Sequence, residues 1–215
     1  MDCLADWEKF LHDRSLPPLV QVALGHYQFE AIHPFLDGNG RVGRLLNTLF
    51  LVERDILPTP LLYLSAFFEA TRADYYERLR AVTERGRWEA WLEYFLNGVA
   101  RQSEDALYRA ERINRHLTEW RMATAGVSSK VPSLLIDLLA ANPFLKVKSV
   151  ADTLGIAFTT VQRAFHTLEK LTVITEVTQA KRDRVYCAKA LLDILEEPAM
   201  LGGPGTALDG RASGF

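Results

Sequence analysis

The chain has 215 residues, a formal net charge of −2, 48% hydrophobic residues and 24% charged residues, which excludes general disorder and allows one large domain or two small ones. Its two cysteines, Cys3 and Cys187, lie near opposite ends, so a disulfide framework and a cysteine metal cluster are excluded. The chain has neither a signal-peptide pattern nor an uninterrupted apolar stretch of about 18 residues, so we expect a cytoplasmic protein without membrane contact.

Helical periodicity dominates the first part of the chain. Apolar residues recur at spacings of three and four over residues 4–11, and a second, more uniformly apolar helix is predicted over residues 20–32, ending at His33-Pro34. Further helices are predicted over residues 41–56, 62–68, 72–84 and 88–124. The last is long, and its second half is polar on most faces, so we expect it to leave the first core. Residues 1–124 are therefore predicted to form a mainly α-helical domain.

The pattern changes after this domain. Residues 125–131 are small and polar and are expected to be a linker. Short helices are predicted over residues 132–141, 149–154 and 159–171. β-branched residues over 172–177 and a short apolar segment, 185–187, flank a polar turn, which is the pattern of a β-hairpin. Three short helices followed by a hairpin predict a winged helix-turn-helix domain over residues 132–198.

The segment HPFLDGNGRVGR, residues 33–44, contains most of the candidate catalytic and phosphate-binding residues of the chain. Gly38, Asn39 and Gly40 allow a tight turn with positive φ that leads directly into a helix. The N-terminus of that helix presents unpaired backbone N–H groups and the positive end of the helix dipole, which together form a site for a phosphate. An isolated glycine-rich turn is usually only a turn, but here several informative residue types converge.

Charged side chains flank this turn on both sides. Arg41 and Arg44 lie about one helical turn apart on nearly the same face, and two guanidinium groups there suit more than one phosphate. Asp37 would repel phosphate unless a cation bridges the two, and a hard oxygen ligand beside phosphates indicates Mg²⁺. Within residues 33–44, His33 is the one side chain that can act as a base near neutral pH. The segment therefore predicts phosphoryl or nucleotidyl transfer, with His33 accepting a hydroxyl proton.

The same segment resembles the signature of the Fic family (filamentation induced by cyclic AMP). That signature reads His-Pro-Phe-x-Asp/Glu-Gly-Asn-Gly-Arg-x-x-Arg, and every specified position is matched. The resemblance extends upstream to His26-Tyr27-Gln28-Phe29-Glu30 and downstream through Asp74-Tyr75-Tyr76, so it covers roughly residues 1–105. The winged-helix segment resembles a common C-terminal companion of Fic domains. The resemblance implies a Fic-type helical domain that acts as a protein adenylyltransferase.

This resemblance implies a role for each residue of the motif. His33 would be the general base that activates a Ser, Thr or Tyr hydroxyl of a target protein, and AMP would move from ATP to that hydroxyl. Asp37 would hold Mg²⁺ on the nucleotide phosphates. The implied nucleotide contacts are Asp37, Gly38, Asn39, Gly40, Arg41, Arg44, Tyr75 and Tyr76. Asn39 would reach the α-phosphate, and Phe35 would be a core anchor that fixes the loop. Tyr75 and Tyr76 could instead simply pack in the core.

Two family features lie outside the match. Family members usually carry a β-hairpin flap that pairs with an extended target segment, and we expect this chain not to supply it, because only three residues precede Leu4. The inhibitory pattern Ser/Thr-x-x-x-Glu-Gly/Asn is not completed either. Ser65 and Glu69, like Thr172 and Glu176, are followed by a residue that is neither Gly nor Asn. Either the chain is part of a longer product, or it is an uninhibited domain that presents targets weakly.

The winged-helix segment carries a local basic excess. Residues 143–190 contain eight lysines and arginines against four aspartates and glutamates, which suits phosphate contacts. Residues 159–171 would be the recognition helix, and residues 181–184 would lie in a wing. The expected nucleic-acid contacts are Gln162, Arg163, Lys181, Arg182 and Arg184. A module that only packs or binds proteins is the alternative, and the glycine-rich residues 199–215 are expected to be a disordered tail.

Two function classes therefore stay open. One is an Mg²⁺- and ATP-dependent enzyme that modifies a protein hydroxyl and carries an accessory domain. The other is a DNA-binding regulator whose Fic portion is degenerate or senses nucleotide. The intact His33 and Asp37 favour the enzyme, because a nucleotide sensor has little use for a base. A homodimer is compatible with either class.

Overall fold

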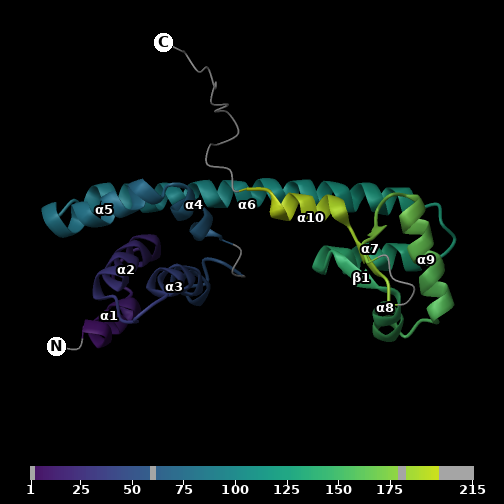
Figure 1. The fold of residues 1–215 in the computed structure, drawn as a ribbon, viewed down its shortest axis with the longest axis horizontal. Helices are drawn as coiled ribbons and strands as arrows, with labels where there is room; N and C mark the ends of the chain where they lie inside the picture. The colour runs from purple at the N-terminus through teal and green to yellow at the C-terminus, as the bar shows by residue number, and fades with distance from the viewer. Residues whose placement is uncertain (1–2, 59–61, 179–182, 199–215) are drawn as a thin grey trace, which may run out of the picture. The chain divides into compact units, whose positions relative to one another are not determined.

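The computed structural model describes residues 3–58, 62–178 and 183–198, and it is mainly helical (Figure 1). The described part of the chain divides into two compact units. The first contains the residues up to Ala106 together with Pro198, and the second runs from Leu107 to Glu197. None of the described helices combines the length and the hydropathy needed to cross a membrane.

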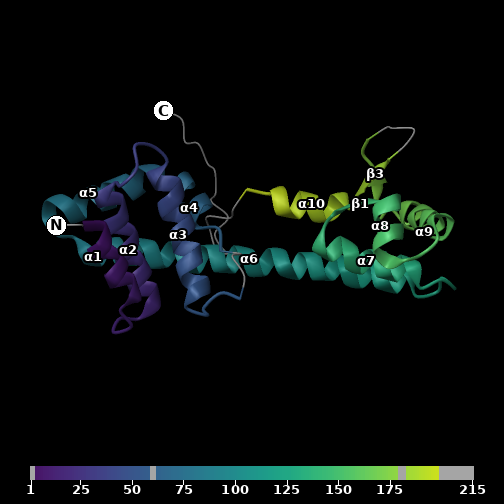
Figure 2. The ribbon, with the colours of Figure 1, turned by 90° about the horizontal axis from the view of Figure 1, so that it is seen from below.

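The first unit is a bundle of helices, as its periodicity predicts. It contains α1 (Cys3–His12), α2 (Pro18–Ile32), α3 (Asn39–Glu53), α4 (Leu64–Ala70), α5 (Arg72–Arg85) and the first half of α6 (Trp88–Thr124). Helix α2 packs against both α1 and α3 (Figures 1 and 2). It begins at Pro18, because the fixed φ of proline suits the first turn of a helix. It ends where His33 adopts a left-handed φ of 52°, directly before Pro34.

Aromatic side chains form the core of this unit. Trp91 and Phe95 on α6 have no solvent exposure, and the Trp91 Nε1–H donates a hydrogen bond to the Ala23 carbonyl at 2.9 Å, which ties α6 to α2. Gly98 lets α4 approach α6 closely, since a Cβ there would lie 2.5 Å from the Phe67 ring. The core thus fixes α2, which carries His33 at its end, and α4.

The second unit combines short helices with a small antiparallel sheet. It contains the second half of α6, then α7 (Val131–Ala141), β1 (Phe144–Lys146), α8 (Val147–Leu154), α9 (Phe158–Lys170), β2 (Thr175–Glu176), β3 (Val185–Cys187) and α10 (Lys189–Glu196). The strand order is β1-β3-β2, and Tyr186 of β3 lies opposite Leu145 on one side and Glu176 on the other. The three predicted helices and the hairpin are present, but β1 and α10 were not predicted.

The boundary between the units differs from the predicted linker. It falls inside α6, because Leu117 and Trp120 of that helix are buried in the core of the second unit. The residue that follows α10 also holds the second half of α6. Arg112 forms a two-pronged ion pair with the Glu197 carboxylate, and Arg109 donates to the Glu197 carbonyl at 2.9 Å. The predicted tail, residues 199–215, lies outside the described residues.

Candidate functional site

The turn between α2 and α3 exposes the start of α3. Gly38 occupies the N-cap position with a φ of 81°, a left-handed conformation that suits glycine. No side chain caps α3. Because the first backbone N–H groups of a helix have no intrahelical acceptor, this end of α3 can accept an anion. Of the three residues expected to take a positive φ in this turn, only Gly38 does, because Asn39 and Gly40 already belong to α3. His33 also has a positive φ, which was not predicted.

Asn39 holds the turn in shape. Its Oδ1 accepts a hydrogen bond from the Phe35 N–H at 2.8 Å, and its Nδ2 donates to the Phe35 carbonyl at 2.6 Å. Asn39 is only 2% exposed. The prediction that Phe35 is a core anchor is wrong, since Phe35 is 48% exposed. The backbone of Phe35, fastened by Asn39, fixes the loop, so the ring does not need to be buried.

The expected base and the residues expected to contact nucleotide line one cavity of about 310 Å³. They are His33, Asp37, Gly38, Asn39, Gly40, Arg41, Arg44, Tyr75 and Tyr76. The last two reach the cavity from α5, far along the chain from the turn. Four further lining residues were not predicted: Leu36, Phe68, Glu69 and Arg72. The structure therefore brings the predicted residues together, while their roles stay predictions.

Positive charge outweighs negative charge around this cavity. Among the residues that the structure describes, three arginines line it and two carboxylates do, those of Asp37 and Glu69. The Arg72 guanidinium lies over the Tyr76 ring, 5.8 Å from its centroid. Arg41 Nη2 lies 3.7 Å from an oxygen of Asp37, whose side chain is 94% exposed, so solvent screens this pair. The cavity is therefore suited to a ligand with several negative charges.

A buried polar chain supports the floor of the cavity. His26 on α2 is fully enclosed, its Nε2 lies 2.9 Å from the Tyr75 hydroxyl, and its Nδ1 lies 3.1 Å from Asn47 Nδ2. Burial lowers the pKa of His26 to about 4, so the ring is neutral at pH 7. Burial also raises the pKa of Tyr75, which keeps its hydroxyl protonated. Tyr75 thus belongs both to the core and to the cavity wall.

The donors at this site fit a magnesium ion only when a ligand supplies most of the coordination. Among the described residues, no group of three or more His, Cys, Asp and Glu side chains could hold a metal ion. Asp37 alone offers an exposed carboxylate beside the start of α3. Magnesium is commonly held by one or two carboxylates together with substrate phosphates, so a single aspartate fits Mg²⁺ bound to a nucleotide.

In the second unit, the expected nucleic-acid contacts lie on α9 and next to β3. Gln162 and Arg163 are exposed on α9, and Arg184 Nη1 lies 3.3 Å from a Glu176 carboxylate oxygen. Lys181 and Arg182 fall outside the described residues.

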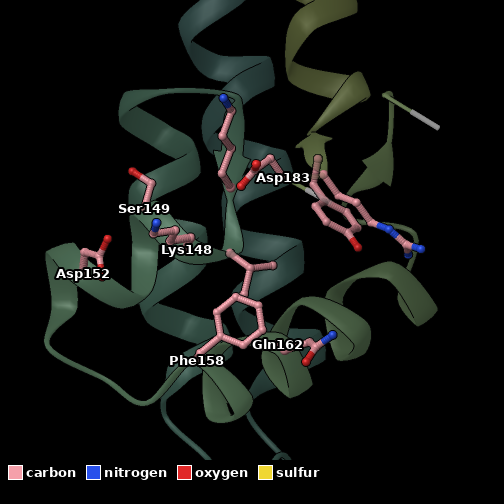
Figure 3. Close-up of a pocket in the computed structure, with 10 residues that line it drawn as sticks. Lys148, Ser149, Asp152, Phe158, Gln162 and Asp183 are labelled. Atoms are coloured by element: carbon pink, nitrogen blue, oxygen red, sulfur yellow. The ribbon is translucent and has the colours of Figure 1, made fainter. Parts of the chain in front are cut away.

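A cavity of about 690 Å³ opens between these elements. Figure 3 shows Lys148, Ser149 and Asp152 of α8 on one side of it and Phe158 and Gln162 of α9 on the other. Lys146 and Arg184 add two more cations to its lining.

The first unit thus presents an uncapped helix N-terminus and a histidine at a cavity lined by arginines. Together these features form a site suited to an anionic ligand. Residues 1–51 match the family model of the Fic/DOC family. The chain is 35% identical over 112 residues to "Protein adenylyltransferase fic-1" of Caenorhabditis elegans, covering 51% of this chain and 20% of that protein. It is 48% identical over 52 residues to "Protein adenylyltransferase Fic" of Drosophila willistoni, covering 24% of this chain and 10% of that protein.

The chain therefore spans a fifth or less of the length of these curated relatives. A crystal structure of a Fic family protein from Desulfovibrio desulfuricans G20 aligns with 86% of this chain and 54% of its own, with 23% identity and a TM-score of 0.46.

Proposed function

We propose that the first unit transfers AMP from ATP to the hydroxyl group of a protein side chain. One observation carries this proposal: the histidine, the uncapped start of α3 and the three arginines face the same cavity. Similarity to proteins named adenylyltransferases supports it. A site for phosphates alone would not need an exposed base beside it, and His33 provides one.

Each residue of the site has a separate role in this reaction. The backbone N–H groups at the start of α3 hold a phosphate, and Arg41 and Arg44 bind the phosphates beyond it. His33 takes the proton from the target hydroxyl, whose oxygen forms a bond to the α-phosphorus. The bond from that phosphorus to the β-phosphate oxygen breaks, and pyrophosphate leaves with the negative charge that the arginines stabilise. Asp37 would hold Mg²⁺, which neutralises phosphate charge when bound.

Calorimetry with Mg-ATP tests the nucleotide part of this proposal. We expect the wild-type chain to bind Mg-ATP, and Arg44→Ala to bind it about 10- to 150-fold more weakly, because a hydrogen bond to a charged group contributes about 1.5–3 kcal/mol. Arg14→Ala is the matched control, since Arg14 is exposed and pairs with Glu53 outside the cavity. Equal affinity in wild type and Arg44→Ala would contradict the proposed role of Arg44.

A second function, DNA binding, concerns the second unit. The order helix, strand, two helices and a hairpin, with α9 exposing Gln162 and Arg163, supports a winged-helix interpretation. In this alternative the chain is a DNA-binding regulator whose first unit senses nucleotide. We expect duplex DNA to bind with strong salt dependence, and Arg163→Ala to reduce the slope of log affinity against log salt by about one.

Fluorescence anisotropy with a labelled duplex measures this slope. Arg115→Ala is the control, because Arg115 is an exposed arginine of α6 in the same unit. Salt-independent binding, or no binding at low salt, would leave the second unit as a module that packs or binds proteins.

A further inference from the structure

A carboxylate oxygen is enclosed beneath the start of α3 and has no role in the reaction as described so far. Glu30 is in the last turn of α2, and its Oε1 is closed off from solvent. This oxygen has no hydrogen-bond partner among the described residues. An enclosed acceptor without a partner destabilises the folded chain, so its presence at this place calls for a physical reason.

Two glycines of α3 make the space that this oxygen occupies. A Cβ on Gly43 would lie 2.9 Å from Glu30 Oε1 and 3.0 Å from Phe29 Cδ1, so a side chain there would displace the carboxylate. A Cβ on Gly40 would lie 3.8 Å from the same oxygen. Since both glycines belong to the first turns of α3, the Glu30 carboxylate lies beneath the end of the helix that can accept an anion.

The Arg44 guanidinium lies at the same place. Its Nη1 is 3.1 Å and its Cζ is 3.9 Å from the Cβ position on Gly40, so the side chain folds back toward the N-terminus of α3. Arg44 Nη1 and Glu30 Oε1 therefore flank one point and lie at most about 7 Å apart, a range over which opposite charges in a partly buried site attract. Arg44 is half-buried, whereas Arg41 is exposed, so water screens this attraction less than it would at Arg41.

The helix itself does not favour this position of Arg44. The N-terminus of a helix carries a partial positive charge, so a cation folded over it is repelled. The negative charge of Glu30 beneath the same turn offsets that repulsion. The guanidinium then lies beside the first backbone N–H groups of α3, where a phosphate would bind.

We propose that Glu30 is a positioning residue of the anion site, and that its carboxylate holds the Arg44 guanidinium folded over the start of α3, ready to bind a nucleotide phosphate. This inference rests on the phosphate-binding part of the proposed function. The described lining of the cavity does not include Glu30, so Glu30 acts through Arg44. Its charge also repels phosphate, and this second, opposite effect does not need Arg44.

A double-mutant cycle separates the two effects. Glu30→Gln keeps the size of the side chain, and it is expected to fold because it removes an enclosed charge. In the wild-type background we expect it to weaken Mg-ATP binding about 3- to 10-fold, because the guanidinium occupies its binding position for a smaller fraction of the time. In the Arg44→Ala background we expect Glu30→Gln to leave the affinity unchanged or to raise it, because only the repulsion of phosphate remains to be lost.

Calorimetry measures the four affinities, and the melting temperature of each variant checks its fold. Glu30→Asp keeps the charge and is expected to bind Mg-ATP more tightly than Glu30→Gln. Glu8→Gln, at an exposed glutamate of α1, is the matched control and is expected to bind as wild type does.

Two results would overturn the role of Glu30. An equal loss of affinity in both backgrounds would assign it to the general structure of the site, and unchanged or tighter binding in the wild-type background would leave only the repulsion. AMP transfer is measured separately, as label incorporated into the chain. A chain that shows the predicted change of sign but transfers no AMP would support the role of Glu30 and contradict the transfer reaction, whereas a wild-type chain that does not bind Mg-ATP would overturn both.

Discussion

Replacing His33 with alanine is expected to lower the rate of AMP transfer by about 100- to 10,000-fold, the usual contribution of a positioned general base. Mg-ATP affinity is expected to stay within a small factor of wild type, because His33 is assigned to the target hydroxyl rather than to a phosphate. The side chain is exposed at the end of α2, so its removal leaves no cavity in the core. Incorporation of label from ATP into the chain itself measures the rate.

A second histidine provides the control for this result. His12 is exposed on α1 and does not line the cavity, so His12→Ala is expected to label at the wild-type rate. If His33→Ala retained the wild-type rate while binding Mg-ATP normally, another group would have to accept the proton, and the assignment of His33 as the base would be wrong.

The free energy of unfolding of the first unit is expected to fall by about 3 kcal/mol between pH 7 and pH 4 because of His26. Burial lowers the pKa of His26 in the folded chain from 6.5 to about 4. The unfolded chain therefore binds a proton below pH 6.5 that the folded chain binds only near pH 4. This stability is fully present above pH 6.5 and is lost as the pH falls toward 4.

Urea unfolding followed by tryptophan fluorescence measures this dependence. Three of the four tryptophans, Trp7, Trp88 and Trp91, lie in the first unit and report mainly on it. Carboxylates such as Asp13 also contribute at acidic pH, so the informative quantity is the difference between wild type and His26→Gln. We expect the variant to be less stable at pH 7 but to lose less stability on acidification. Identical pH slopes would contradict a buried, neutral His26.

The helices of the first unit follow closely from the sequence, because their apolar spacing and their stop signals agree. The differences are at the ends. Helix α3 begins at Asn39 instead of residue 41, because Gly38 takes the left-handed cap conformation and the helix starts directly after it. Helix α2 begins at Pro18 instead of residue 20, because the fixed φ of proline suits the first turn of a helix. Both differences come from backbone conformations that periodicity does not register.

Short elements of the second unit escaped prediction for a different reason. β1 has three residues, too few for an alternating pattern, and it exists because Phe144, Leu145 and Lys146 pair with β3. In α10, buried Leu191 and Ile194 are three residues apart, a signal that was available in the sequence. The position of the unit boundary inside α6 depends on tertiary packing alone.

The candidate site could be predicted where its residues are neighbours in the chain. His33 to Arg44 form one turn, so their proximity follows from the sequence. Tyr75 was included only through a family resemblance, because α5 brings it to the cavity from a distant part of the chain. Glu69 and Arg72 were missed, since nothing in their local sequence shows that α4 and α5 carry them to the same cavity.

The central claim, that this cavity transfers AMP, is tested most directly by incubating the chain with Mg²⁺ and ATP labelled either on the α-phosphate or on the γ-phosphate. The proposed reaction keeps the α-phosphorus on the protein and releases the β- and γ-phosphates together. We therefore expect covalent label from α-labelled ATP, none from γ-labelled ATP, and its loss in His33→Ala. Transfer of the γ-label, or no α-label on a chain that binds Mg-ATP, would contradict the account.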